Sequence, residues 1–286
     1  MSDTSTRSIA VCLACYNRKA ATLRCLRNLL SAKLPPFYAL EIYLVDDASP
    51  DGTADAVRTE FPGVAIYESS GNLFWGGGMR QAISEAMERG HDFYLWLNDD
   101  VEILSDAFCR VIETYEQVSS GGRTPAIVLA ATCDQDGKTT YSGMRRMGFN
   151  PLGFRRVEPD RERPVRCDTM NGNFVLVPAR IANVVGNIDA RFKHRIGDID
   201  YGLRVCRAGF EVWLAPGYAG FCPANTSAGV WASANYSFRQ RWQHVRSPLG
   251  APFWEWIVFG YRHGGILGLG SVLMQYRWLF FPFRRD

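Results

Sequence analysis

The chain has 286 residues, of which 47% are hydrophobic, enough to bury the core of one large domain or of a domain with an appendage. Its formal net charge of +3 is too small to indicate a nucleic-acid-binding protein. From Cys222 to the end the sequence holds seven Arg, no Lys and two acids, a net of +5, so the first 221 residues carry 3 − 5 = −2. A basic segment on a slightly acidic body indicates contact with an anionic surface such as lipid headgroups.

The cysteines and the N-terminal segment indicate a reducing compartment. Eight cysteines are scattered, mostly in apolar segments, as is typical of reduced core thiols. Cys12 and Cys15 form a C-x-x-C, but no second pair follows, and a strand would place the two on opposite faces. The apolar run 9–15 is too short for a signal peptide, so a cytoplasmic protein is expected.

Strands and helices alternate through the first half of the chain, which predicts βαβ units on a largely parallel sheet. Expected strands span residues 9–15, 41–45, 64–67 and 93–97. Expected helices span about 19–32, with Leu23, Leu26 and Leu30 on one face, then 53–61 with Thr53 as cap, 79–89, and 105–117 with Ser105 as cap.

After a Gly-rich break at 121–125 the pattern changes. A strand at 126–131 and a turn at Asp136-Gly137 precede a long loop at 145–166, which carries seven Arg against three acids. These arginines could hold a diphosphate or an anionic acceptor, or the loop could be a solvated flap. A helix fragment at 181–185, a helix from about Asp198 to Gly209 and a strand at 211–215 follow.

The C-terminal segment is rich in aromatic residues and arginines. Its longest uncharged apolar run, 264–274, has eleven residues and four glycines, short of the ~20 that a transmembrane helix requires. Two alternatives stay open: the segment lies in a membrane interface, or it packs against the body or across a dimer. The residues concerned are Trp254, Trp256, Phe259, Tyr261, Trp278, Phe280, Phe281 and Phe283, with Arg262, Arg277, Arg284 and Arg285.

Two acids follow the strand at 93–97, in the sequence Asn98-Asp99-Asp100. Ligands of open α/β sheets bind outside the carboxyl ends of the strands, so these carboxylates are expected where a metal meets a phosphate. Hard oxygen ligands favour Mg²⁺ or Mn²⁺, which complete their shells with diphosphate and water. A turn or a helix cap is the alternative here, and an N-cap is the alternative for Asp198.

These motifs resemble one family when they are taken together. Tyr16-Asn17-Arg18 after the first strand, Asp46 after the second, Asp99-Asp100 after the fourth and Gly197-Asp198-Ile199-Asp200 before a helix recur in this order in family 2 glycosyltransferases. The match covers about residues 8–216. Within the family, Gly71-Asn72 with Trp75-Gly76-Gly77-Gly78 is similar to bacterial rhamnosyltransferases and related cell-surface polysaccharide enzymes.

The resemblance implies an α/β glycosyltransferase A fold: a Rossmann-like, mixed but mostly parallel sheet flanked by helices, with a C-terminal aromatic and basic extension. It implies a catalytic domain at 1–221, with a nucleotide-sugar half at about 8–125 and an acceptor half at about 126–221. Residues 222–286 would form a membrane-interface or oligomerisation extension.

The resemblance also assigns roles to residues. Asp46 would bind the pyrimidine base and Asp99 the ribose side, with Tyr16, Asn17, Arg18, Asn72, Gly78 and Asn98 also on the donor. Asp100 would coordinate Mn²⁺ or Mg²⁺, and Asp198 would be the general base. Trp75, Gly172, Asn173 and Asp200 would lie on the acceptor side. The chain departs from the family pattern at Asn98, at Gly197 and after the last core strand, where the family often has a His that binds the metal. Cys222 or His194 could replace this ligand. A surface position without metal is the expectation for His194.

The chemistry follows from these residue types. One metal and one carboxylate base predict direct displacement with inversion, unlike the two carboxylates of retaining hydrolases. The implied activity is transfer of a hexose or deoxyhexose from a UDP- or dTDP-sugar to a lipid-linked or polysaccharide acceptor, by a peripheral protein on the inner face of the cytoplasmic membrane. A sugar-phosphate nucleotidyltransferase is one alternative, but its glycine-rich phosphate loop is missing after the first strand. An inactive glycan- or membrane-binding scaffold is the other.

Overall fold

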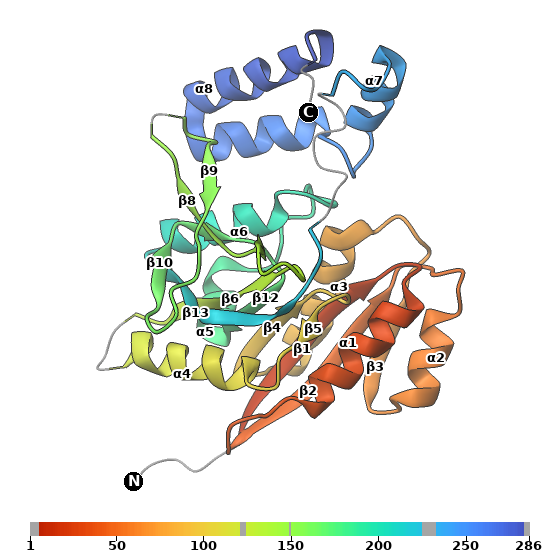
Figure 1. Cartoon of the computed structure of the whole chain (residues 1–286), viewed down its shortest axis with the longest axis vertical. Helices are drawn as coiled ribbons and strands as arrows, with labels where there is room; N and C mark the ends of the chain where they lie inside the picture. The colour runs from red at the N-terminus through yellow and green to blue at the C-terminus, as the bar shows by residue number, and fades with distance from the viewer. Residues whose placement is uncertain (1–5, 121–123, 149, 225–232, 283–286) are drawn as a thin grey trace.

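The computed structural model describes residues 6–120, 124–148, 150–224 and 233–282 (Figure 1). Several residues discussed above lie outside these ranges: the glycine-rich break at 121–123, and Phe283, Arg284 and Arg285 of the C-terminal segment.

The elements of the first half are β1 (Arg7–Cys15), α1 (Lys19–Ser31), β2 (Tyr38–Asp46), α2 (Thr53–Glu60), β3 (Val64–Glu68), α3 (Phe74–Arg89), β4 (Phe93–Leu97), β5 (Glu102–Ile103) and α4 (Ala107–Ser119). The second half contains β6 (Ala126–Cys133), β7 (Thr139–Tyr141), β8 (Gly143–Arg146), β9 (Phe154–Arg156), β10 (Val165–Cys167), β11 (Thr169–Met170), β12 (Phe174–Pro178), α5 (Ala179–Val185), α6 (Gly197–Arg207), β13 (Glu211–Phe221), α7 (Phe238–Arg246) and α8 (Phe253–Phe280).

A mixed sheet forms the centre of the molecule, in the order β10-β13-β6-β12-β4-β1-β2-β3. Strands β3, β2, β1 and β4 are parallel neighbours, so β1, β2 and β4 end at one edge, called the carboxyl edge below. Strand β12 is antiparallel to β4, with Phe174 opposite Leu97, so β12 begins where β4 ends. The residues just before β12 therefore lie beside those just after β4, as the mixed, mostly parallel sheet predicted from the resemblance requires.

Helices cover both faces of this sheet, because the strands are buried on both sides. Helices α1, α2 and α4 pack on one face, around Leu26, Val57 and Phe108. Helices α3, α5 and α6 pack on the other, around Met79 and Tyr201. The β4 strand FYLWL is buried at every position, which confirms the prediction from its uninterrupted apolar run.

The prediction of a single loop over 145–166 holds only in part, because short strands interrupt the segment. Strands β8 and β9 form a hairpin in a separate three-stranded sheet with β11, and the segment ends in β10 at the edge of the main sheet. The exposed ends of this hairpin carry arginines instead of alternating apolar residues, so the period-2 signal is absent. Tertiary pairing, not local pattern, makes these residues strands.

Three local predictions also need correction. Helix α3 begins at Phe74, one turn before the expected start, because Asp47 accepts the amide hydrogens of Leu73 and Phe74 at 3.0 and 2.8 Å. In α1 the buried leucines are Leu26 and Leu29, while Leu30 is 54% exposed. Neither Thr53 nor Ser105 is a cap, since Gly52 and Asp106 precede these helices and neither makes a side-chain cap bond.

The C-terminal segment folds into two helices, α7 and α8. Residue Gly265 has φ 57° and ψ −141°, so α8 is two helical arms that meet at a sharp kink, as Figure 1 shows. The first arm lies against the body of the molecule, where Phe259 packs near Phe192 and Leu203. Packing against the body, one of the two alternatives, therefore holds for this arm.

Candidate active site

The acids after β4 converge on one arginine from the loop after β1. Nη1 of Arg18 lies 2.6 Å from Oδ2 of Asp100, and Nη2 lies 2.5 Å from Oδ1 of Asp99. The hydroxyl of Thr22 donates to Oδ2 of Asp99 at 3.0 Å. The parallel arrangement of β1 and β4 thus places a guanidinium between two carboxylates at the carboxyl edge.

Burial governs the electrostatics of this group. Asp99 is fully buried, and burial raises its pKa to about 7, although the charge of Arg18 opposes the rise. Oδ1 of Asp99 is buried and lies 2.5 Å from Nη2 of Arg18, in an ion pair that lacks hydrogen-bond geometry. Arg18 therefore already supplies positive charge to this oxygen.

The loop after β2 contains two acids with different tasks. Asp46 is buried, and its Oδ1 accepts the amide of Ser49 at 2.9 Å. Asp47 accepts the Ser69 hydroxyl at 2.6 Å in addition to the amides at the start of α3. Asp47 therefore fixes the 69–74 loop against the end of β2, a role that the sequence analysis did not assign.

Trp75 joins the β4 acids to the bend before β12. Its Nε1 donates to Oδ1 of Asn98 at 2.8 Å, so the side chain of Asn98 holds this ring. A Cβ on Gly172 would lie 2.7 Å from Cη2 of Trp75 and 3.3 Å from Cβ of Asp198. Only glycine leaves room for the ring and the acid at this bend.

Asp198 is the second residue of α6 and is held by backbone amides. Its Oδ2 accepts from Gly172 at 2.9 Å and its Oδ1 from Ile199 at 2.8 Å. Burial raises the pKa of Asp198, while these hydrogen bonds act in the opposite direction. Ile196, not Asp198, occupies the N-cap position, so the capping alternative for Asp198 is wrong.

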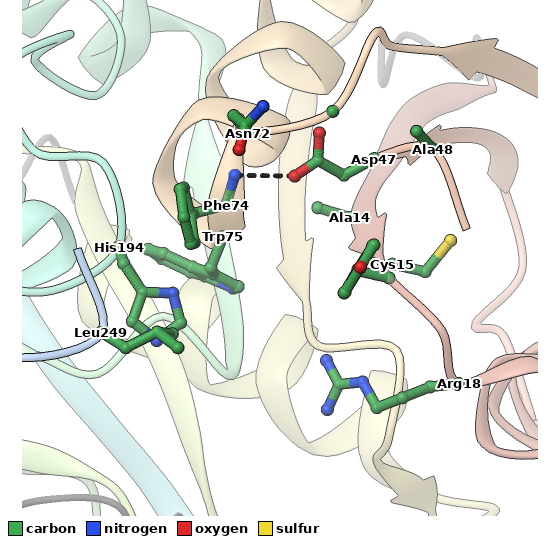
Figure 2. A pocket seen from close by; sticks show the side chains of 12 residues that line it. Ala14, Cys15, Arg18, Asp47, Ala48, Asn72, Phe74, Trp75, His194 and Leu249 are labelled. Atoms are coloured by element: carbon green, nitrogen blue, oxygen red, sulfur yellow. Dashed lines mark hydrogen bonds between the residues drawn. The ribbon is translucent and has the colours of Figure 1, made fainter. Parts of the chain in front are cut away.

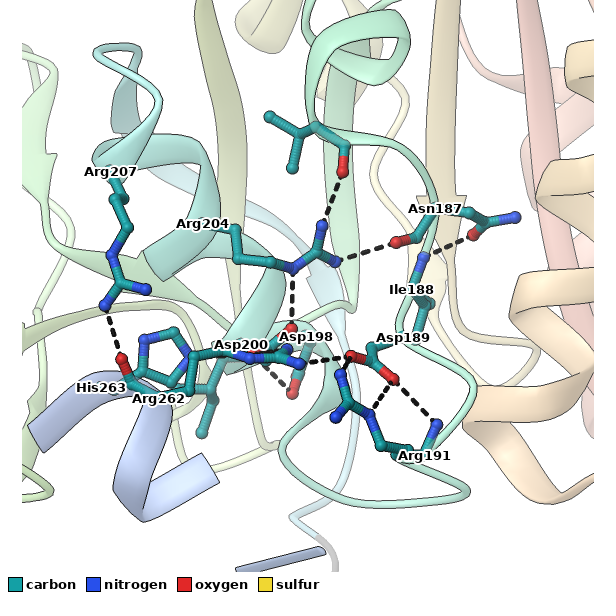
Figure 3. Close-up of polar contacts among 12 residues, drawn as sticks. Asn187, Ile188, Asp189, Arg191, Asp198, Asp200, Arg204, Arg207, Arg262 and His263 are labelled. Atoms are coloured by element: carbon teal, nitrogen blue, oxygen red, sulfur yellow. Dashed lines mark hydrogen bonds and ion pairs between the residues drawn. The ribbon is translucent and has the colours of Figure 1, made fainter. Parts of the chain in front are cut away.

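Asp200 anchors α6 to the C-terminal segment (Figure 3). This buried carboxylate pairs with Arg204 at 2.8 Å, with Arg262 at 2.7 Å and with Nε2 of His263 at 2.8 Å. Arg262 also pairs with Asp189 at 2.6 Å. Burial alone would raise the pKa of Asp200, but hydrogen bonds from these partners hold it below its ordinary value. Asp200 thus acts on the structure that carries Asp198.

A cavity of about 530 Å³ opens at the carboxyl edge (Figure 2). Predicted donor residues Tyr16, Arg18 and Asn72 line it, together with the predicted acceptor residue Trp75. Asp47 also lines the cavity, whereas the predicted acids lie behind the lining: Arg18 contacts Asp99 and Asp100, and the ring of Trp75 reaches Gly172 beside Asp198. Arg18 and Trp75 are therefore the side chains through which the cavity meets the acids.

The other predicted site residues lie around this cavity without lining it. The backbone N–H of Asn17 donates to the Ser49 hydroxyl at 2.9 Å, next to Asp46. Nδ2 of Asn173 donates to the Thr132 hydroxyl at 2.9 Å, inside the sheet. Gly78 lies within α3, where a Cβ would meet Ala14 at 2.7 Å, so close helix–strand packing explains this glycine.

His194 and Leu249 also line the cavity. The motifs indicated His194 only as a possible metal ligand, and no motif indicated Leu249. His194 is not a surface residue: it is partly buried, its Nδ1 has no hydrogen-bond partner, and burial lowers its pKa to about 4. It is held in place because the carbonyl of Lys193 accepts from Gly76 at 2.7 Å. The basic cluster Lys193-His194-Arg195 just before α6 was the feature of the sequence that could have indicated His194 as a cavity residue. Leu249 reaches the cavity only through tertiary packing.

The acids suit a divalent cation in part. Asp99 and Asp100 already share one positive charge, that of Arg18. Within the described ranges no three His, Cys, Asp or Glu side chains form a cluster able to hold a metal by themselves. Such a pair fits Mg²⁺ or Mn²⁺, which take one or two carboxylates and fill the shell with diphosphate and water.

Of the two replacement ligands considered, Cys222 rather than His194 lies beside Asp100. The thiol of Cys222 is 3.5 Å from Oδ1 of Asp100, and burial raises the pKa of this thiol. Cys222 is therefore protonated at neutral pH in this state, and a thiol is a weaker ligand for hard cations than a carboxylate.

Comparison with known proteins gives a family match and a relative at low identity. The model of the family "Glycosyl transferase family 2" matches residues 10–175, a range that includes Arg18, Asp99 and Asp100 but ends before Asp198. An N-acetylglucosaminyl-diphospho-decaprenol L-rhamnosyltransferase of Mycobacterium tuberculosis is 25% identical over 217 residues, which cover 66% of this chain and 67% of that protein.

Solved structures show the same fold at low identity. The crystal structure of GalNAc-T7 with UDP, GalNAc and Mn²⁺ superposes with a TM-score of 0.57 at 14% identity, covering 97% of this chain. This chain spans 56% of the length of that structure. The mannosyltransferase PcManGT from Pyrobaculum calidifontis, in complex with GDP-Man and Mn²⁺, superposes with a TM-score of 0.56 at 15% identity. The superposition covers 96% of this chain and 74% of the mannosyltransferase chain.

Proposed function

Because the chain belongs to glycosyl transferase family 2, as its family match over 10–175 shows, we propose that it is an inverting, metal-dependent enzyme that transfers a sugar from a UDP- or dTDP-sugar to a lipid-linked or polysaccharide acceptor. The observation that carries the proposal is the cavity at the carboxyl edge, bounded by Arg18 and Trp75, with two acids behind one and Asp198 behind the other. Rhamnose is the proposed sugar, since a relative at 25% identity is named a rhamnosyltransferase.

The donor half of the cavity suits a nucleoside diphosphate. Tyr16 is an exposed aromatic ring at its rim, and Arg18 supplies a guanidinium for phosphate oxygens. Asp46, Asn17, Asn72, Asn98 and Asp99 remain our proposed ligands for the base and ribose. Asp100 would hold Mg²⁺ or Mn²⁺, and the cation would offset the negative charge that develops on the leaving diphosphate.

Asp198 is the proposed general base. Its two oxygens accept backbone amide hydrogens, which fix the carboxylate at the bend of Gly172 and beside the edge of Trp75. A raised pKa makes this carboxylate a better proton acceptor than an exposed aspartate. An acceptor hydroxyl at this bend would lose its proton to Asp198 while it attacks the anomeric carbon opposite the diphosphate, which gives inversion.

The acceptor and location follow from the same proposal. Gly172, Asn173 and Trp75 would contact the acceptor sugar, and Asp200 would position α6. The relative is named for a sugar linked to decaprenol, which supports a lipid-linked acceptor. A lipid-linked acceptor would place the enzyme on the inner face of the cytoplasmic membrane, in the synthesis of cell-envelope polysaccharide. Residues 1–221 are the proposed catalytic domain, and 222–286 the extension for membrane contact or dimer formation.

A thermal-shift panel tests the donor assignment. UDP, dTDP, GDP and CDP are added with and without Mn²⁺, and a ligand that binds only the native state raises the melting temperature. We expect a shift with UDP or dTDP that grows with Mn²⁺ and is lost in Arg18→Ala. Equal melting temperatures in all samples would contradict the proposal, and release of pyrophosphate from a nucleoside triphosphate and a sugar phosphate would support the nucleotidyltransferase alternative.

A further inference from the structure

Helix α8 passes a length and composition test for a membrane-spanning helix, but its shape does not permit spanning. Within the described chain it is the one helix long and apolar enough to cross a bilayer, with a mean hydropathy of 1.2. The kink at Gly265 divides it into an inner arm (253–264) and an outer arm (266–280). At the helical rise these arms are about 18 Å and about 22 Å long, shorter than a hydrocarbon core of about 30 Å.

The two arms are packed into a hairpin by small residues. A Cβ on Gly268 would lie 2.0 Å from the carbonyl oxygen of Gly260, and a Cβ on Gly260 would lie 2.6 Å from Cγ2 of Val272. Glycine is needed at both positions because the two backbones touch there. The hairpin is thus a fixed unit, and the arms cannot straighten without opening this contact.

The inner arm is bound to the catalytic body. Arg262 and His263 pair with Asp200 of α6, and Arg207 donates to the carbonyl of Arg262 at 2.7 Å. In Figure 1 the outer arm lies on the far side of the inner arm, away from the sheet. The outer arm is therefore the outermost layer of the molecule at this end.

The exposed face of the outer arm is apolar and has no acid. Ile266 and Leu267 are 83% and 74% exposed, and exposed positions recur one helical turn apart along one face. Between 256 and 282 the sequence contains no Asp or Glu. The exposed residues of the outer arm are Ile266, Leu267, Gly270, Leu273, Met274, Arg277 and Phe280.

Helix α7 continues this face with aromatic and basic residues. Phe238 and Trp242 are exposed and stacked, with ring centroids 6.3 Å apart, and Phe238 lies 5.8 Å from Phe280. Arg241 donates to the carbonyl of Leu279 at 3.2 Å, which fixes α7 to the end of the outer arm. Arg239 and Arg246 are exposed on the same helix.

We propose that the outer arm and α7 dock on a lipid bilayer with anionic headgroups, with the outer arm lying along the membrane interface and not across the bilayer. Apolar side chains would enter the headgroup boundary, while Trp242 and the arginines would meet the polar layer. A second copy of the chain fits less well, because two such faces would bring like charges together without an acid to pair them.

Flotation of the full-length protein with vesicles tests this docking without nucleotide or acceptor. Vesicles of phosphatidylcholine with phosphatidylglycerol are compared with phosphatidylcholine alone. We expect binding to the anionic vesicles that weakens with salt, and a loss of at least about tenfold in bound fraction for the double variant Leu273→Asp, Met274→Asp. Val184→Asp, at an exposed apolar position of α5, is the matched control and should float like the wild type.

One further variant and additional measurements separate the outcomes. Arg277→Gln should reduce binding to anionic vesicles and leave the weaker binding to neutral ones unchanged. Melting temperatures and nucleotide-induced shifts, measured on every variant, show that the body remains folded, so a loss of donor binding is distinct from a loss of docking.

Wild-type protein that stays unbound, or a double variant that floats as well as the wild type, would overturn the proposal. A dimer in light scattering that the double variant dissociates, without vesicle binding, would identify a second copy as the occupant.

Discussion

Replacing Gly172 by Ala tests the contact that joins Trp75 to Asp198. The new Cβ would lie 2.7 and 2.8 Å from Cη2 and Cζ2 of Trp75 and 3.3 Å from Cβ of Asp198. The ring cannot move freely, because its Nε1 is bonded to Asn98 at 2.8 Å, and the bend cannot move freely, because its amide is bonded to Asp198 at 2.9 Å. Overpacking of this kind destabilises a folded protein by about 1–3 kcal/mol.

The same displacement should impair transfer more than donor binding. A shift of about 1 Å in a group that positions a reactant lowers rates by about 10²-fold, so kcat/KM should fall between about tenfold and 100-fold. The Kd for UDP or dTDP should change less than kcat/KM, since the proposed ligands Tyr16, Arg18 and Asp46 come from the ends of β1 and β2, whereas Gly172 precedes β12. Urea denaturation gives the change in the free energy of unfolding, and a coupled assay of nucleotide release gives the kinetics.

A double variant distinguishes this clash from a general effect of alanine. Trp75→Phe removes the two ring atoms that meet the new Cβ, so Gly172→Ala should cost less stability when it is combined with Trp75→Phe than when it is made in the wild type. Gly63→Ala, where a Cβ would meet nothing within 4 Å, is the control and should change stability by less than about 0.5 kcal/mol. If Gly172→Ala is as stable and as active as the wild type, the proposed contact between the ring and the base is wrong.

Three other predictions concern charged groups. Arg18→Ala should weaken binding of UDP or dTDP by about tenfold in calorimetry, because charged hydrogen bonds to phosphate are lost. Arg24→Ala is the control: it removes a surface ion pair made by α1 and should leave nucleotide binding unchanged. The pKa of Asp198 is raised by burial, so kcat/KM should rise with pH through an apparent pKa above the ordinary value of about 3.9; a limb at or below that value would contradict the assignment. Asp200→Asn should lower the free energy of unfolding by about 3 kcal/mol in urea titrations, because it leaves buried positive partners without a counter-charge, and an unchanged midpoint would refute this.

Much of the sheet could be predicted from the sequence because its strands are buried on both faces and end abruptly in polar residues. Strand β4 is the clearest case, with five buried residues followed by Asn98. The hairpin of β8 and β9 could not be predicted, since its exposed arginines give no alternation and its partners are distant in the chain. Likewise the start of α3 depends on Asp47 and Lys193, which no local pattern reveals.

The candidate site shows a similar division. The order of motifs indicated Arg18, Asp99 and Asp198. Arg18 meets Asp99 because the parallel strands β1 and β4 end at one edge, whereas Asp198 reaches the bend before β12 from the start of α6. The place of His194 and Leu249 in the cavity lining could not be predicted from motifs, because they reach it from a loop and from the C-terminal segment. The kink at Gly265 was equally hidden, since a glycine in an apolar run fits a straight helix as well as a hairpin.

The central claim is that Asp198 removes the proton from the acceptor hydroxyl. The most direct test is the rate of sugar transfer by Asp198→Asn, measured together with the Kd for the donor nucleotide. Asparagine keeps the size of the side chain and one hydrogen-bond acceptor, so the nucleotide Kd should stay within about twofold, while transfer should fall by about 10²–10⁴-fold because no base remains. Transfer near the wild-type rate, with an unchanged dependence on pH, would contradict the assignment.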